Sequence, residues 1–96
     1  MKTRRHLGIE IDDARRKAER IRTVIVDLDC TVQLLDCHIA AEELEAQVFD
    51  LSNVAYPKHA KSLSVRRDNL NITITALEKN LAVIRAALAE TVATAA

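Results

Sequence analysis

The sequence predicts an all-α fold, a long, coiled-coil-like antiparallel two-helix hairpin, and three observations support it. The 96 residues include one Gly, one Pro and two aromatic side chains, too few for the turns and strands of a β-rich fold. Apolar residues recur at alternating steps of three and four in two long stretches. Between these stretches lies one short run of turn-forming residues.

The first stretch predicts a helix over residues 9–51. Its apolar ladder alternates steps of three and four without a break, and its single charged member is Glu42. The ladder consists of Ile11, Ala14, Ala18, Ile21, Ile25, Leu28, Val32, Leu35, Ile39, Glu42, Ala46 and Phe49. A helix of this length is typical of a coiled coil or a helical hairpin. We expect residues 1–8 to form a flexible basic arm, with Gly8 as the helix N-cap.

The second stretch predicts a helix over residues 57–92, after a turn at residues 52–56. Ser52 and Asn53 favour the turn, and Pro57 suits the first position of a new helix. The second ladder consists of Ala60, Leu63, Arg67, Leu70, Ile74, Leu77, Leu81, Ile84, Leu88, Thr91 and Ala95. Residues 9–96 are therefore expected to form one helical-hairpin domain.

Antiparallel pairing about this turn predicts a register for the two ladders. Leu35 falls opposite Ile74, and Glu42 falls opposite Arg67, the one charged member of the second ladder. A polar layer inside an apolar seam typically excludes wrong registers at some cost in stability. We therefore expect Glu42 and Arg67 to share a layer that sets the register.

A second apolar row begins at residue 30, on the side of the first helix that faces away from the ladder. It consists of Cys30, Leu34, Cys37, Ala41, Leu44, Val48 and Leu51. A two-helix hairpin covers one stripe on each helix, so this row would stay exposed in a monomer. We expect a homodimer in which two hairpins form a four-helix bundle. A different helical protein partner is the alternative occupant of this row.

Charge is unevenly distributed along the chain although the formal net charge is zero. Residues 1–22 are rich in Lys and Arg, residues 23–50 contain acids but no Lys or Arg, and residues 58–67 contain bases but no acid. Pairing of the two helices accounts for such blocks. An alternative function is association with nucleic acid through the basic arm and the start of the first helix. The candidate contacts are Lys2, Arg4, Arg5, Arg15, Arg16 and Arg20.

No residue pattern predicts an enzyme, a cofactor or a metal site. Cys30 and Cys37 lie too far apart on one helix for a disulfide, and we interpret them as buried small hydrophobes. Gly8 is the only glycine, which excludes a Gly-rich phosphate loop. No apolar run has membrane-spanning length, and no secretory signal is present, so the expected location is the cytoplasm.

The length and the single central turn resemble those of the small helical-hairpin secretion proteins of the WXG class. Those proteins carry a Trp in their turn motif, whereas residues 52–57 of this chain read Ser-Asn-Val-Ala-Tyr-Pro and the chain has no Trp. No function is carried over from that class. The sequence alone therefore predicts a non-enzymatic protein–protein interaction or scaffold module that self-associates.

Overall fold

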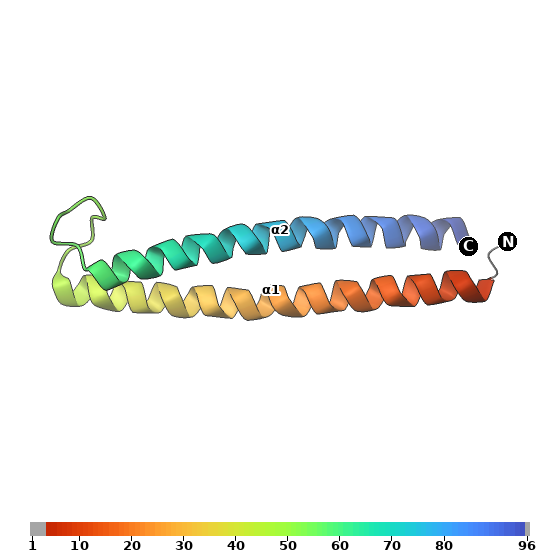
Figure 1. The fold of residues 1–96 in the computed structure, drawn as a ribbon, viewed down its shortest axis with the longest axis horizontal. Helices are drawn as coiled ribbons and strands as arrows, with labels where there is room; N and C mark the ends of the chain where they lie inside the picture. Colours follow the sequence, from red (N-terminus) through yellow and green to blue (C-terminus); the bar gives the residue numbers. More distant parts are fainter. Residues whose placement is uncertain (1–3, 96) are drawn as a thin grey trace. The chain divides into compact units, whose positions relative to one another are not determined.

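The computed structural model describes the backbone of residues 4–95 and contains two α-helices, α1 (Arg4–Ala46) and α2 (Lys58–Ala95). Residues 47–57 form the loop that joins them (Figure 1). The all-α class predicted from the sequence is confirmed, and residues 4–95 contain no strand. Neither helix, over this described range, has a stretch long and apolar enough to cross a lipid bilayer.

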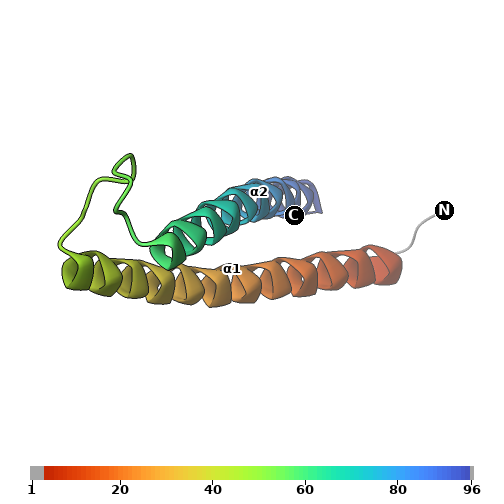
Figure 2. The ribbon, with the colours of Figure 1, turned by 60° about the vertical axis from the view of Figure 1, so that its left-hand side comes forward.

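The chain divides into two compact units, and each pairs a segment of α1 with a segment of α2. Unit 1 comprises Met1–Val26 with Thr75–Ala96, and unit 2 comprises Asp27–Ile74. Unit 2 is a helical hairpin that contains the loop, and Figure 2 shows this loop leaving the end of α1 and leading into α2.

The two predicted ladders form the buried faces of the helices. Every ladder position from Ile11 to Glu42, and from Ala60 to Thr91, is buried or half-buried. In unit 1 the buried apolar residues are Ala18, Ile25 and Leu81, and in unit 2 they are Leu35, Ile39, Tyr56, Ala60 and Ile74. A period of three and four residues is thus sufficient to identify the inner face of both helices.

The end of α1 differs from the prediction, because the helix stops at Ala46 and not at residue 51. Gln47 adopts a left-handed conformation, with φ of 56°. Its amide donates to the carbonyl of Leu44, and the amide of Val48 donates to the carbonyl of Glu43, both at 3.3 Å. This pair of bonds is a Schellman motif, which closes a helix by satisfying its last carbonyls. The predicted ladder therefore fails beyond Glu42, and Phe49 is exposed.

Short-range hydrogen bonds organise the loop. Oδ1 of Asp50 accepts from the amide of Ser52 at 3.0 Å and from its hydroxyl at 2.8 Å. These two bonds lower the pKa of the Asp50 carboxyl. Oδ1 of Asn53 likewise accepts from the amide of Ala55 at 2.9 Å. Asp and Asn side chains that bond to the backbone two residues later compete with helix formation, so they keep this segment out of α1.

The start of α1 also differs from the prediction. Residues 4–8 are helical, so Gly8 lies inside α1 and is not its N-cap. A Cβ at Gly8 would meet no atom within 4 Å, so nothing in the fold requires a glycine there. Arg4 and Arg5 are good helix formers, which is consistent with the longer helix. Residues 1–3 of the predicted arm lie outside the described residues.

Candidate interaction surface and polar contacts between the helices

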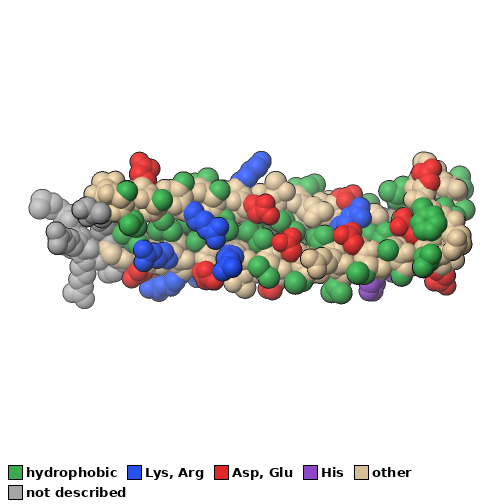
Figure 3. Space-filling view, turned by 180° about the vertical axis from the view of Figure 1, so that it is seen from behind, with side chains coloured by type: hydrophobic (Ala, Val, Ile, Leu, Met, Phe, Trp, Pro, Cys, Tyr) green, Lys and Arg blue, Asp and Glu red, His purple; other side chains and the backbone are tan. Residues whose placement is uncertain are grey.

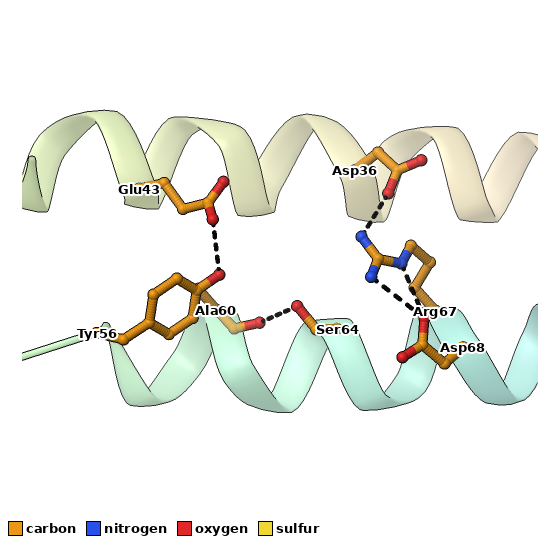
Figure 4. Close-up of polar contacts among 7 residues, drawn as sticks. All are labelled: Asp36, Glu43, Tyr56, Ala60, Ser64, Arg67 and Asp68. Carbon is orange, nitrogen blue, oxygen red and sulfur yellow. Dashed lines mark hydrogen bonds and ion pairs between the residues drawn. The ribbon is translucent and has the colours of Figure 1, made fainter. Parts of the chain in front are cut away.

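The centre of unit 2 contains an ion pair between the helices (Figure 4). Nη1 of Arg67 donates to Oδ1 of Asp36 at 3.1 Å, and Nε and Nη2 donate to Oδ1 of Asp68 at 3.2 Å. The bond to Asp36 raises the pKa of the guanidinium, while partial burial opposes this rise. The Asp36 side chain is 52% exposed, so water screens this pair.

Glu42 faces a different partner. Nδ1 of His59 lies 2.6 Å from Oε1 of Glu42, and the His59 side chain is exposed. The other carboxylate oxygen of Glu42, Oε2, is buried and has no hydrogen-bond partner. A buried acceptor without a protein donor is unfavourable, so Glu42 lowers the stability of the hairpin.

Tyr56 anchors the end of the loop against α1. Its hydroxyl donates to Oε2 of Glu43 at 3.0 Å, and its side chain is buried (Figure 4). Burial and the hydrogen bond to Glu43 raise the pKa of the phenol, because both disfavour the tyrosinate. Ser64 is also buried, and its hydroxyl bonds to the carbonyl of Ala60 one turn earlier. The buried Tyr56 side chain thus holds the end of the loop in place just before α2 begins.

These contacts correct the predicted register. The sequence placed Glu42 opposite Arg67, whereas in the structure Arg67 binds Asp36 and Glu42 meets His59. The change corresponds to a shift of roughly one heptad. Because the ladders repeat with that period, such a shift again places ladder residues opposite ladder residues. The pairs Asp36–Arg67 and Glu42–His59 therefore replace the predicted pair Glu42–Arg67. That such polar pairs set the register stays a prediction.

The predicted second row is exposed where it lies on α1. We call its helical part the α1 outer row; it consists of Cys30, Leu34, Cys37, Ala41 and Leu44. Leu34 is 63% exposed and Leu44 is 62% exposed. The last two predicted members, Val48 and Leu51, lie in the loop and do not continue the helical row.

A second exposed apolar row lies on α2 within unit 2. We call Val65 and Ile72 the α2 outer row; they are 56% and 68% exposed. Apolar side chains also reach the surface in the loop, where Phe49, Leu51 and Val54 are exposed. Figure 3 shows apolar side chains at the surface of the chain. Unit 2 therefore exposes apolar side chains on both helices and in the loop.

The sequence predicts that the two cysteines are buried, and this prediction is wrong for the single chain. Cys30 and Cys37 are both free thiols on the exposed α1 outer row. Among the described residues, no group of three or more His, Cys, Asp or Glu side chains is placed to hold a metal ion. The cysteines thus belong with the apolar outer row.

The basic residues of the alternative function lie in unit 1. Arg15, Arg16 and Arg20 are exposed on α1. Arg4 and Arg5 belong to the helix, but their side chains, like Lys2, lie outside the described residues. Between the helices of unit 1 there is also an open hollow of about 390 Å³, lined in part by Ile11 and Leu88. Its lining is mainly apolar, and Glu10 and Lys17 are its two ionisable residues.

Sequence reasoning missed Asp36, Tyr56 and His59 as contact residues. Tyr56 could have been found, since an aromatic residue just before Pro57 in a chain so poor in aromatics is a plausible anchor. Asp36 and His59 lie beside the ladders, and their contacts depend on a register that the period alone does not determine. The chain matches no known family model, no curated protein and no solved structure.

Proposed function

We propose that this protein is a non-enzymatic protein–protein interaction or scaffold module, a helical hairpin that self-associates. The observation that supports the proposal most strongly is the α1 outer row, where Leu34 and Leu44 are more than half exposed on a regular helical stripe. Isolated exposed apolar residues are ordinary, but a continuous stripe on one helix face marks an interaction site. The simplest closed assembly is a two-fold dimer that forms a four-helix bundle.

Analytical ultracentrifugation of the full chain in reductant tests the proposal. We expect wild type to sediment as more than a monomer at tens of micromolar. Leu44→Asp should shift it toward monomer, because a carboxylate on the outer row would have to be desolvated in the interface. Val24→Asp is the matched control, since Val24 is an exposed apolar residue of α1 in unit 1. A monomeric wild type would rule the proposal out.

Association with nucleic acid is the second candidate, favoured by the exposure of Arg15, Arg16 and Arg20 on one helix segment. Binding carried by phosphate contacts weakens steeply as salt is added. We would therefore expect a labelled duplex to bind at low salt and to be released by added salt. Absence of binding at low salt would dismiss this candidate.

A further inference from the structure

We propose that copies of this chain meet head to tail, with the α1 outer row of one copy against the α2 outer row of the next. This inference rests on the proposed self-association and replaces the two-fold dimer with a head-to-tail geometry. It makes the contact heterologous, so that two different faces of the same molecule meet. Such contacts build rings or open assemblies, whereas a two-fold contact stops at a dimer.

The first argument is the placement of the two rows within unit 2. Cys37 lies two residues from both Leu35 and Ile39, so at about 100° per residue it faces away from that buried pair. Ile72 lies two residues from both Leu70 and Ile74, and it faces away from the α2 ladder in the same manner. Because the ladders face each other inside the hairpin, the two outer rows lie on opposite sides of unit 2. One partner hairpin seated on the α1 outer row therefore leaves the α2 outer row uncovered.

The second argument is the charge beside each row. The α1 segment of unit 2 has acids and no Lys or Arg, and Asp27, Asp29 and Glu45 on it are exposed. On the outer side of α2, Lys58 and Lys61 are exposed just before Val65.

Packing one α1 outer row against another would bring two acidic segments together. Packing it against the α2 outer row brings acids next to lysines. Like charges brought together disfavour an interface, whereas complementary charges favour the contact and fix its register. The charges therefore select a second copy as the occupant and α2 as its contacting helix.

Complementation between two single-face variants tests the inference. Leu44→Asp places a charge in the α1 outer row alone, and Val65→Asp places a charge in the α2 outer row alone. Both positions are exposed, so helix content by circular dichroism should stay that of wild type. Val24→Asp again serves as the control outside both rows. All proteins are kept reduced, so that Cys30 and Cys37 do not cross-link the copies.

In sedimentation velocity, we expect wild type to grow beyond a dimer as its concentration rises. Each single-face variant alone should have the mass of one chain, or at most a greatly reduced association. Mixed in equal amounts, the two variants should form a 1:1 heterodimer, because each still presents the one face that the other lacks. The mass of the mixture should therefore double relative to either variant alone.

Two results would overturn the inference. If Val65→Asp alone keeps the wild-type mass while Leu44→Asp is monomeric, the copies meet through α1 on both sides. The proposed function then stands without this geometry. If wild type itself is monomeric, both proposals fail. Should Val65→Asp lose helix content, Lys61→Glu replaces it, since reversing an exposed charge leaves the buried ladder intact.

Discussion

Units 1 and 2 bring α1 and α2 together by different means. Unit 2 combines buried ladder residues with polar contacts. Two of these contacts join the helices, at Asp36–Arg67 and Glu42–His59, and a third joins the loop to α1, at Glu43–Tyr56. In unit 1 the buried apolar side chains are Ala18, Ile25 and Leu81, and an open hollow lies beside Ala14 and Leu88. A heptad ladder brings two helices together in several equivalent registers, whereas polar contacts fit one register. We therefore predict that the polar contacts of unit 2 set the register of the two helices.

The largest expected effect separates the two cores. Ile39→Ala in unit 2 should cost about 3 kcal/mol of unfolding free energy, since Ile39 is 5% exposed and its loss leaves a cavity. Leu88→Ala in unit 1 should cost about 1 kcal/mol, because Leu88 is half-buried beside an existing hollow. Urea unfolding of both variants measures the difference. Equal losses would mean that the two units are packed alike.

The next effect concerns the loop end of unit 2. Gln47→Gly should raise the unfolding free energy by about 1 kcal/mol, since Gln47 has a left-handed backbone that glycine adopts without strain. Gln33→Gly is the matched control, because Gln33 is exposed inside α1, where glycine should instead cost about 1 kcal/mol. Loss of stability in Gln47→Gly would show that its side-chain bond to the Leu44 carbonyl matters more than the strain.

A smaller effect tests the register itself. A double-mutant cycle on Asp36→Ala and Arg67→Ala should give a coupling energy of about 0.5 kcal/mol, since the pair is partly exposed. The cycle on Glu42→Ala and Arg67→Ala should give a value near zero. The reverse order of couplings would restore the register in which Glu42 meets Arg67.

The last effect depends on pH. Tyr56 is the only tyrosine, so the absorbance of tyrosinate reports its pKa directly, and the midpoint should lie above the ordinary value of 10.0. A raised folded-state pKa contributes stability that is complete below pH 10 and is lost as pH rises through the folded value. Tyr56→Phe should therefore lose less stability than wild type between neutral and alkaline pH. A midpoint at or below 10.0 would mean that the phenol is exposed.

The inner faces of the helices could be predicted from the sequence because period is a local property. Every step of three or four residues can be counted without knowing the partner. The register could not be predicted in this way, since a ladder shifted by one heptad still matches. The observed register places Arg67 next to Asp36, a residue outside the ladder. Period counting therefore gives no information about that contact.

The end of α1 shows a second limit. Ala46 and Phe49 continue the apolar spacing, so the pattern extends the helix past its true end. The hydrogen bonds of Asp50 and Asn53 and the left-handed Gln47 compete with that pattern and end the helix. Exposure of the α1 outer row followed from counting faces, but what covers it depends on a second molecule. The candidate surface could therefore be predicted from one chain, and its occupant could not.

These three polar contacts also differ in how much chain separates their partners. Tyr56 lies 13 residues from Glu43, His59 lies 17 from Glu42, and Arg67 lies 31 from Asp36. Closing a longer segment costs more entropy, so contacts of low sequence separation form first. Tyr56 should thus meet Glu43 before the other two pairs form. During synthesis on the ribosome, α1 emerges first and must keep its apolar ladder exposed until the loop and the first turns of α2 have followed.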